Sequence, residues 1–462
     1  MIDSHAHLDF PQFDPDRDEV IKSGFKNGLE AVVNIGIDME TSRKSVELAM
    51  RHQNIFATVG VHPHDAQERP PDYIEILRKM VDDDSKGPRK IVAIGEIGLD
   101  YYRDMSPRDV QRKVFAEQLE LAKSLELPVV IHIREAMADS LAIIKESGIL
   151  RGVLHSFPGS ADEARNAIDL GFFISFAGPI TYPKSNRPDV ASALPLGRVL
   201  VETDSPYLTP QAFRGKRNKP EYVRYVIEKL ADIFAPYTFE DIERMTSLNA
   251  RRLFGLPIDK KGKAVYKIRR SLYINLTNRC TNNCHFCVRR GPSHGYVAGH
   301  YLFLDSEPTS NDVIAGINGE KDFDEIVFCG LGEPTLRLKE MLEICAALKK
   351  SHPKTPIRLD TNGHGNLINK MDVPPKLVGF VDRVSVSLNA QDAETYVRIC
   401  NPDRGRESYG AMLRFIKDCV AQGMPVETSV VDLPEIDIAA CRALAESLGA
   451  TLRIRRHSQS EI

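Results

Sequence analysis

The first half of the chain alternates between short apolar runs and longer amphipathic segments. Eight runs rich in β-branched and aromatic residues lie at 2–5, 31–36, 56–61, 91–95, 129–133, 152–156, 172–176 and 199–202. In the clearest intervening segment, Val114, Leu121 and Leu125 recur at helical spacing. Eight strands that alternate with helices are typical of a (β/α)8 barrel of the TIM type. We therefore predict such a barrel.

The second half repeats this alternation with fewer strands. Six apolar runs lie at 272–276, 325–329, 356–359, 383–387, 426–430 and 451–454, and helical segments such as 338–351 separate them. About six strands of this kind predict an incomplete (β/α)6 barrel. The expected fold class of the whole chain is α/β.

A domain boundary is expected between the two sets of strands. Residues Arg252 to Leu256 have the pattern of the end of a packed helix, and a polar run at 259–263 follows. The length of 462 residues agrees with more than one domain, because single domains usually have about 100 to 200 residues. We expect a first domain at 1–257, a linker at 258–265 and a second domain at 266–462.

Composition and charge narrow the classes of function. With 42% hydrophobic and 27% charged residues, the chain has the composition of a packed globular protein. Its net charge of −3 provides no global basic field, so any contact with nucleic acid must be local. No apolar run approaches the ~18 residues of a transmembrane helix, and the first residues lack the pattern of a targeting segment. We expect a cytoplasmic protein without a membrane partner.

Metal-ligand residues follow the predicted strands of the first domain, where barrel enzymes carry out their chemistry. They are His5, His7, His62, His64, Glu96, His132, His155 and Asp204. A single histidine at such a position is usually structural, but six of the 13 histidines occur here together with two carboxylates. This mixture of nitrogen and oxygen ligands suits Mg²⁺, Mn²⁺ or Zn²⁺.

The segments that carry these residues resemble the TatD family of metal-dependent deoxyribonucleases over residues 1–257. They are Ser4-His-Ala-His-Leu-Asp9, Gly60-Val-His-Pro-His64, Gly95-Glu-Ile-Gly-Leu-Asp-Tyr101, Val130-Ile-His132, Leu154-His-Ser-Phe157, Glu202-Thr-Asp-Ser-Pro-Tyr207 and Arg214-Gly-Lys-Arg-Asn218. The resemblance implies that His5, His7, Glu96 and Asp204 hold one divalent metal ion. It implies that Glu96, His132 and His155 hold a second, so that Glu96 bridges the two.

A two-metal site of this kind can lower the pKa of a bridging water and clamp the oxygens of a phosphodiester. Asp204 could orient or deprotonate that water, which makes Glu96 and Asp204 the expected catalytic residues. His62 and His64 are expected to contact substrate phosphate, although a structural role for His64 stays open.

A basic loop after the eighth strand could also bind phosphates. It carries Arg214, Lys216 and Arg217, and its alternative role is that of a solvated loop. Tyr101, Tyr102, Phe157, Tyr207 and Phe213 could stack on unpaired bases, but most of them are expected to be packing residues. The expected partner is a nucleic acid, above all single-stranded DNA, or a nucleotide.

The cysteine pattern of the second domain indicates a different chemistry. Cys280, Cys284 and Cys287 form a CxxxCxxC motif directly after the first predicted strand of this domain. Three thiolates leave one iron of a 4Fe-4S cluster without a protein ligand. A zinc site would need a fourth ligand, for which His285 or His294 would be available. The other five cysteines are scattered, so we predict one cluster only.

The cysteine motif and the following strand ends resemble the radical S-adenosylmethionine enzymes over residues 266–462. These ends are Phe328-Cys-Gly-Leu-Gly-Glu-Pro334, Asp360-Thr-Asn-Gly363 and Ser387-Leu-Asn-Ala390. The resemblance implies that the open iron binds S-adenosylmethionine and that a reductant supplies one electron to cleave it to a 5′-deoxyadenosyl radical. The implied cofactor contacts are Phe286, Gly330, Gly332, Glu333, Pro334, Ser387 and Asn389.

The combination of the two domains resembles the TatD-nuclease-associated radical S-adenosylmethionine proteins. Our leading hypothesis is a bifunctional enzyme that joins a two-metal deoxyribonuclease to a radical enzyme. One alternative makes the first domain an amide or ester hydrolase, because a two-metal water also attacks carbonyl carbon; the basic loop favours phosphate. Another alternative makes the barrel a non-catalytic module that presents substrate, but the complete ligand set argues against it.

Overall fold

The computed structural model describes residues 1–290 and 294–456, which form two compact units. The first unit is Met1–Ile258 and the second begins at Asp259. The end of the predicted second domain, 457–462, lies outside the described residues. Within the described ranges, the structure has no helix that is both long and apolar enough to cross a membrane.

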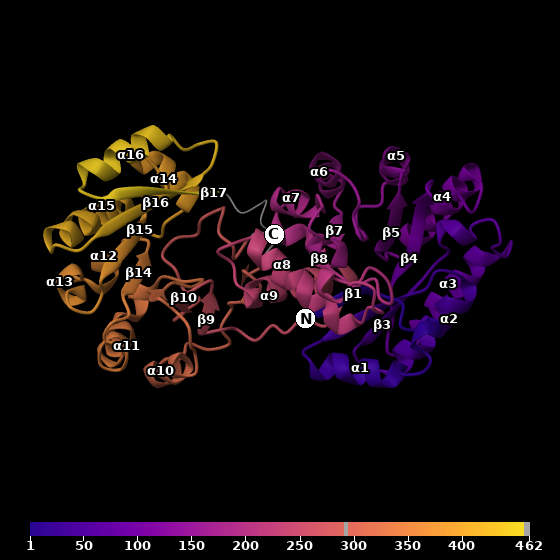
Figure 1. Cartoon of the computed structure of the whole chain (residues 1–462). Coiled ribbons are helices and arrows are strands. Elements are labelled where there is room, and N and C mark those ends of the chain that lie inside the picture. Colours follow the sequence, from indigo (N-terminus) through magenta and orange to yellow (C-terminus); the bar gives the residue numbers. More distant parts are fainter. Residues whose placement is uncertain (291–293, 457–462) are drawn as a thin grey trace. The chain divides into compact units, whose positions relative to one another are not determined.

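The first unit is a parallel sheet of eight strands in sequential order (Figure 1). The strands are β1 (Ile2–Ala6), β2 (Ala31–Ile35), β3 (Ile55–Val59), β4 (Ile91–Asp100), β5 (Val129–Arg134), β6 (Gly152–Leu154), β7 (Phe173–Phe176) and β8 (Val199–Val201). The first and last strands meet, because the His7 amide donates to the Ser205 carbonyl at 2.8 Å and the Asp204 amide to the His5 carbonyl at 2.9 Å. The prediction of a (β/α)8 barrel is confirmed.

Helices connect these strands and close one end of the barrel. They are α1 (Arg17–Lys26), α2 (Met39–Arg51), α3 (Tyr73–Asp84), α4 (Arg108–Ser124), α5 (Met137–Ser147), α6 (Ala161–Asp169), α7 (Arg187–Ser192), α8 (Val223–Ile233) and α9 (Phe239–Phe254). Apolar side chains from the amino ends of the strands form one cluster with Leu253 and Phe254 of α9. Because α9 covers the amino ends, the polar carboxyl ends are left for the site.

Strand β4 is longer than its apolar run predicts. The run was expected to end at Gly95, whereas β4 continues to Asp100, so Glu96 lies inside the strand and not after it. The pairing with β5 is irregular between Ile94 and Ile97 and resumes where Ile97 pairs with Ile131 and Gly98 with His132. A side chain at Gly98 would lie 2.0 Å from the His132 carbonyl oxygen. Glu96 and the glycines at 95 and 98 do not resemble strand residues, so this extension was not predicted. The glycines nevertheless allow β4 to approach β5 closely.

The second unit contains a seven-stranded sheet of the order β17-β16-β15-β14-β13-β10-β9. Its strands are β9 (Val265–Ile268), β10 (Ser271–Ile274), β13 (Glu325–Phe328), β14 (Ile357–Thr361), β15 (Arg383–Ser387), β16 (Val426–Asp432) and β17 (Thr451–Arg456); a separate hairpin pairs β11 (Tyr296–Val297) with β12 (His300–Tyr301). The six strands from β10 to β17 are parallel, as predicted for a partial barrel.

Strand β9 was not predicted. It pairs antiparallel to β10 across the two residues Arg269 and Arg270, and its first residue falls in the expected linker. The connection has basic residues where hairpin turns usually have Asn-Gly or Asp-Gly, and this explains why no hairpin was predicted.

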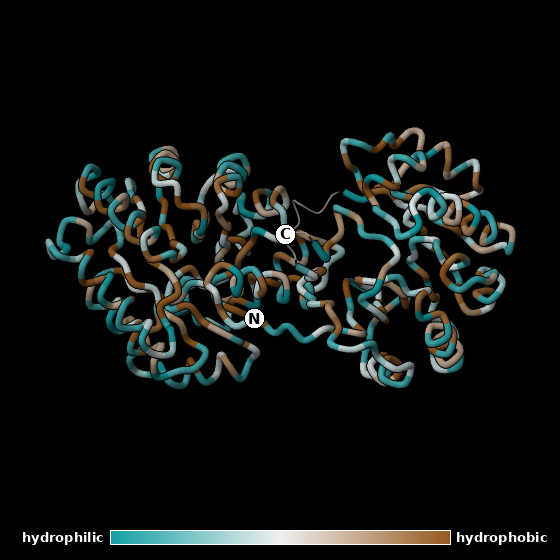
Figure 2. The backbone as a smooth tube through the Cα atoms, turned by 180° about the vertical axis from the view of Figure 1, so that it is seen from behind, coloured by the Kyte–Doolittle hydropathy of each residue, from teal (hydrophilic) through white to brown (hydrophobic). Residues whose placement is uncertain are grey.

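Helices cover one face of this sheet. They are α10 (Ser310–Asn318), α11 (Leu338–Ser351), α12 (Gly365–Asn369), α13 (Pro374–Leu377), α14 (Ala393–Cys400), α15 (Arg406–Ala421) and α16 (Ile438–Ser447). Alternate strand residues such as Ile326, Leu359 and Val386 pack with these helices in the apolar core. In Figure 2, the hydrophobic colour follows the strands and the inner sides of the helices in each unit. The intervening strand residues therefore face the opposite, concave side.

Candidate functional site

Glu96 lies at the centre of the histidines that the sequence singled out. Its Oε2 atom lies 3.3 Å from Nε2 of His5 and 3.8 Å from Nε2 of His7. Its Oε1 atom lies 3.1 Å from Nδ1 of His132 and 3.0 Å from Nε2 of His155. Each carboxylate oxygen of Glu96 thus faces its own pair of histidines.

Asp204 joins the first of these groups. Its Oδ1 atom lies 3.4 Å from Nε2 of His7 and 3.6 Å from Nε2 of His5. The backbone places it there, because its amide donates to the His5 carbonyl where β1 meets the segment after β8. Asp204 has a φ of 55°, in the left-handed region, where aspartate is tolerated better than most residues.

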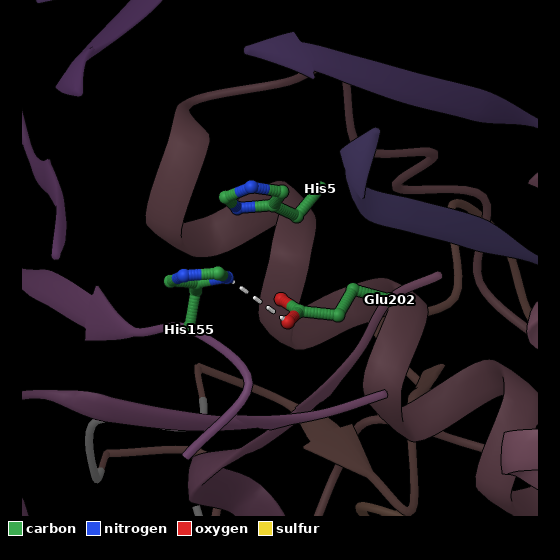
Figure 3. Close-up of side chains that lie close together, drawn as sticks. All are labelled: His5, His155 and Glu202. Atoms are coloured by element: carbon green, nitrogen blue, oxygen red, sulfur yellow. Dashed lines mark ion pairs between the residues drawn. The ribbon is translucent and has the colours of Figure 1, made fainter. Parts of the chain in front are cut away.

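Two further carboxylates orient the histidines and were given no role by the sequence analysis. Nε2 of His132 lies 3.2 Å from Oδ2 of Asp100, and Nδ1 of His155 lies 3.4 Å from Oε1 of Glu202. Figure 3 shows the second pair beside His5, whose ring stacks on that of His155. Strand alternation could have indicated both, because Asp100 is four residues after Glu96 and Glu202 two before Asp204.

The junction of the first and last strands rests on buried polar residues. Asp3 accepts hydrogen bonds from the Thr203 amide at 2.9 Å and from the Thr203 hydroxyl at 2.5 Å. Burial raises the pKa of Asp3 to about 8 against the lowering effect of these bonds. Asn218 donates to the Thr203 carbonyl at 2.9 Å, which ties the basic loop to the same segment.

Hydrogen bonds on the outer side of each ring indicate which nitrogen is available. His7 bonds the Ile35 carbonyl through Nδ1, and His132 bonds Asp100 through Nε2. An acceptor on the outer nitrogen holds the proton there, so the inner nitrogen presents a lone pair to a metal ion. Nδ1 of His155 lies 3.4 Å from Oε1 of Glu202, an ion-pair distance without a hydrogen bond in the described structure. His7 and His132 are therefore oriented as ligands by hydrogen bonds, and His155 faces a carboxylate on its outer side.

His62 has the opposite arrangement. Its Nδ1 accepts a hydrogen bond from the His64 amide at 3.2 Å, and burial lowers the pKa of the ring to about 4. A neutral ring that accepts at Nδ1 carries its proton on Nε2, which lies 3.5 Å from Oε1 of Glu96. The position of His62 would also allow it to join Glu96 and His132 around a metal ion. The proton on Nε2 favours a hydrogen-bond donor over a metal ligand.

The charges around Glu96 suit a bridging carboxylate. Burial would raise its pKa, but His155, His62 and His5 together hold the pKa well below its usual value. For His5, burial lowers the pKa, which favours the neutral ring that binds metals. In contrast, the neighbouring carboxylates raise the pKa of His7, His132 and His155 despite their burial. A divalent cation therefore competes with protons for these three rings when it binds.

The spacing of these atoms fits divalent ions. Two ligands of one ion with bonds of about 2.1 Å lie about 3.0 to 3.4 Å apart. The separations in the two groups, from 3.0 Å between His155 and Glu96 to 3.8 Å between His7 and Glu96, are close to this range. His5, His7 and Glu96 form one of the clusters that could hold a metal ion. The residues therefore fit the expected two-metal centre.

The other residues expected to contact the substrate have different partners in the structure. Nε2 of His64 lies 2.9 Å from Oδ2 of Asp100, and its side chain is partly exposed. Arg217 pairs with Asp16 at 2.6 Å and also donates to the Gln12 carbonyl. The Arg214 guanidinium lies 4.9 Å from the centre of the Tyr182 ring.

The aromatic residues also divide into two groups. Tyr102 and Tyr207 are exposed, at 55% and 49%, whereas Phe157 is buried and cannot stack on a base. Among the described residues, neither Arg214 nor Lys216 forms an ion pair with a carboxylate. The exposed aromatics and these two cations are thus available to a ligand, while Arg217 is already committed.

The cysteine motif lies in a loop after β10 that is anchored to the end of α14. The Asn283 amide donates to the Cys400 carbonyl at 2.8 Å, and the His285 amide to the Ile399 carbonyl at 3.1 Å. Burial raises the pKa of Cys280 to about 12, and a hydrogen bond with the Cys400 thiol raises that of Cys284. Thiols in this setting ionise only with a cation that compensates the charge.

A network of hydrogen bonds connects the cysteine loop to His364 and Tyr396. His364 bonds the Thr281 hydroxyl through Nδ1 at 2.8 Å and the Tyr396 hydroxyl through Nε2 at 3.1 Å. Asn282 donates to the same Tyr396 hydroxyl at 2.9 Å. Burial lowers the pKa of His364 to about 4, so the ring stays neutral and links both hydroxyls. This network fixes the loop that carries the cysteines.

The geometry of the thiols argues against the zinc alternative. In the described part of the chain, the clusters whose ligand atoms lie within 4.8 Å of one another contain no cysteine. Ligands of one zinc ion would lie about 3.8 Å apart, given Zn–S bonds of about 2.3 Å. In the described structure the three thiols are therefore not gathered around one small ion.

The segment after β13 packs directly on the cysteine loop. A side chain at Gly332 would lie 2.3 Å from the Thr277 carbonyl, and the Glu333 amide donates to the Arg279 carbonyl at 2.8 Å. The Glu333 carboxylate accepts hydrogen bonds from the Thr361 hydroxyl and the Asn362 amide, both at 2.7 Å. Because these bonds engage the Glu333 side chain, the backbone of 330–334 is the part left for a cofactor.

The other expected cofactor residues lie around the same loop. Ser387 ends β15, and the Asn389 side chain donates to the Cys400 thiol at 3.4 Å. Phe286 is partly buried and packs against the apolar core, as does Cys284. Phe286 thus lies within the cysteine motif, Asn389 contacts the helix end that anchors this motif, and Ser387 is two residues before Asn389.

These two sites define a metal-dependent hydrolase barrel followed by a radical S-adenosylmethionine domain. A family model for TatD-related DNases matches residues 2–255, and a model for the radical SAM superfamily matches residues 274–448. The chain belongs to the TatD-related family and carries a radical SAM domain after it. Both domains are enzymatic, so the chain is an enzyme.

Individual relatives cover just over half of the chain. It is 41% identical over 257 residues to the uncharacterized metal-dependent hydrolase YabD of Bacillus subtilis, covering 55% of this chain and 98% of that protein. It is 32% identical to the 3′-5′ ssDNA/RNA exonuclease TatD of Klebsiella pneumoniae, covering 56% and 99%. The crystal structure of the TatD homologue YjjV from Escherichia coli matches with a TM-score of 0.53 and 32% identity, covering 56% and 98%.

Proposed function

We propose that the first unit is a two-metal phosphodiesterase that degrades DNA, preferentially single strands. The observation that carries this proposal is the position of Glu96, whose two oxygens face separate groups of metal ligands. His5, His7 and Asp204 complete one position, and His132 and His155 the other. Two divalent ions held in this way supply Lewis-acid stabilisation for phosphodiester cleavage.

The protein's own groups have distinct tasks in this proposal. Glu96 holds negative charge beside both positions and Asp204 beside one of them, and Asp204 orients the attacking water or accepts its proton. Asp100 keeps the proton of His132 on its outer nitrogen, and Glu202 faces the outer nitrogen of His155. His62 donates from Nε2 to a phosphate oxygen, and His64 lies next to it on the more exposed side.

The choice of a nucleic acid substrate rests on surface groups and on one relative. Arg214 and Lys216 provide local positive charge on a chain with a net charge of −3. Tyr102 and Tyr207 expose flat rings that could stack on unpaired bases. The name of the Klebsiella relative, a 3′-5′ ssDNA/RNA exonuclease, supports the same substrate class.

For the second unit we propose a radical enzyme with one 4Fe-4S cluster held by Cys280, Cys284 and Cys287. S-adenosylmethionine binds at the backbone of 330–334 and near Phe286, Ser387 and Asn389. A cluster held there would supply one-electron reduction of the sulfonium, and a separate reductant would provide the electron. The buried network of Thr281, His364 and Tyr396 holds the cysteine loop in position.

Hydrolysis of single-stranded DNA tests the first proposal. The chain is freed of metal with a chelator, reloaded with Mg²⁺, Mn²⁺ or Zn²⁺, and compared with Glu96→Ala on single-stranded DNA and on ester substrates. We expect metal-dependent cleavage of DNA that falls by orders of magnitude in Glu96→Ala with the fold retained. Equal rates in the two proteins, or cleavage of esters alone, would overturn it.

A further inference from the structure

The concave face of the second sheet carries four arginines. Arg453 and Arg455 lie on β17, Arg358 lies on β14 and Arg383 lies on β15. Strand alternation directs all four away from the face that packs on the helices, because Leu359, Val384 and Leu452 lie on that apolar side. The concave face is the side on which a partial barrel of this kind holds its ligands.

Three of these arginines are already paired, and one of them, Arg383, binds Glu325. Arg358 binds Asp360 at 2.8 Å and Glu325 at 3.2 Å, and Arg453 binds Glu427 at 3.1 Å. Their charges are therefore balanced within the sheet, and a ligand gains little by approaching them.

Arg455 differs from these three. Within the described residues, it donates a long hydrogen bond of 3.4 Å from Nη2 to Oδ1 of Asn389. Its Nε is shielded from solvent and has no hydrogen-bond partner within residues 1–290 and 294–456. Burial and the neighbouring Arg453 lower the pKa of Arg455, while Cys329, Asp360 and Cys284 act in the opposite direction. The guanidinium thus lies near the cysteine loop with donors unused.

We propose that Arg455 binds an oxyanion, a carboxylate or a phosphate, of a ligand held on the concave face beside the cysteine loop. A shielded guanidinium without a carboxylate partner is costly, and a planar oxyanion offsets this cost through two parallel hydrogen bonds. The proposal rests on the proposed radical site for its position beside the cluster. Either the carboxylate of S-adenosylmethionine or an anionic group of the substrate could bring the oxyanion.

Four anaerobically reconstituted full-length chains test this inference: the parent, Arg455→Ala, Arg455→Lys and Arg456→Ala. Arg456 is the matched control, because it lies on the same strand, is exposed and points to the opposite face. The first measurement is equilibrium binding of S-adenosylmethionine and of decarboxylated S-adenosylmethionine. The second is the difference in the midpoint of thermal unfolding between inorganic phosphate and chloride at equal ionic strength. Phosphate bound at the metal site of the first unit would change this midpoint equally in all four chains.

If S-adenosylmethionine brings the oxyanion, Arg455→Ala weakens its binding about tenfold or more and leaves the decarboxylated compound unchanged. If the substrate brings it, S-adenosylmethionine binding stays the same, and Arg455→Ala loses part of the phosphate stabilisation that Arg456→Ala keeps. Arg455→Lys retains the charge, so its losses should lie between those of Arg455→Ala and Arg456→Ala. It takes the place of Arg455→Ala if that variant fails to fold.

Arg455→Ala that matches Arg456→Ala in both measurements would overturn the inference. A parent chain that holds no iron and does not bind S-adenosylmethionine would contradict the proposed radical function instead. In that case the phosphate measurement still decides whether Arg455 binds an oxyanion.

Discussion

Oδ2 of Asp100 lies 3.2 Å from Nε2 of His132 and thereby determines which nitrogen of that ring carries the proton. The inner nitrogen is left as a lone pair that faces Glu96 at 3.1 Å. Second carboxylates of this kind are nearly as important for a metal site as the ligands, because they set the orientation and basicity of the ring. Asp100 therefore belongs to the site although it would not contact a metal ion.

Asp100→Asn is expected to weaken the binding of divalent metal about 10- to 100-fold, because the amide no longer holds the proton on Nε2 of His132. Titration calorimetry of the metal-free protein measures this directly. Asp139→Asn is the matched control, since Asp139 is a partly exposed carboxylate that binds Arg112 and Tyr101. Equal metal affinity in the two variants would show that Asp100 has no orienting role.

His62 and His132 are expected to behave differently when each is replaced by alanine. His132→Ala removes a ligand and should lower metal affinity, whereas His62→Ala removes a donor and should lower the cleavage rate with metal affinity nearly unchanged. The difference follows from the hydrogen bond that Nδ1 of His62 accepts from the His64 amide. A loss of metal affinity in His62→Ala as large as in His132→Ala would make His62 a ligand.

The basic loop is expected to contribute through Arg214 more than through Arg217. Arg217 already pairs with Asp16 at 2.6 Å, so it has little charge to offer a phosphate. Arg214→Ala should raise the KM for single-stranded DNA more than it lowers kcat, and should reduce the salt dependence of binding by about 0.7 in the log–log slope. A slope that falls only in Arg217→Ala would reverse this assignment.

Reductive cleavage of S-adenosylmethionine should depend on Cys284 and not on Glu96. With dithionite, the reconstituted parent is expected to form 5′-deoxyadenosine slowly without any substrate, and Cys284→Ala is expected to form none. Cys345→Ala is the matched control, because Cys345 is buried in the apolar core. Product in Cys284→Ala equal to that in the control, or no iron absorbance in the parent, would contradict the cluster assignment.

Much of this account could be predicted from the sequence. Apolar runs located the strands because each barrel strand is buried on both faces, and the histidines after these runs identified the first site. Glu96 was found as a site residue, but the strand around it was cut short at Gly95, since glycines and a buried carboxylate do not resemble a strand. The position of Glu96 between two pairs of histidines could be seen only in the structure.

Other features depend on contacts between distant segments. Asp100 and Glu202 lie beside His132 and His155, which come from other strands. The sequence can therefore place both carboxylates near the site but cannot show which ring each one faces. The ion pair of Arg217 joins residues 201 positions apart. The proton on Nε2 of His62 follows from one backbone amide, which motif spacing cannot indicate.

The number of divalent ions that each variant binds tests the bridging role of Glu96 most directly. Calorimetric titration of the metal-free parent should give two ions per chain at the hydrolytic site. Glu96→Ala should weaken both binding events, because one carboxylate serves both positions, whereas Asp204→Ala should weaken only one. A Glu96→Ala chain that binds two ions as tightly as the parent, or that loses only one of them, would contradict the bridge.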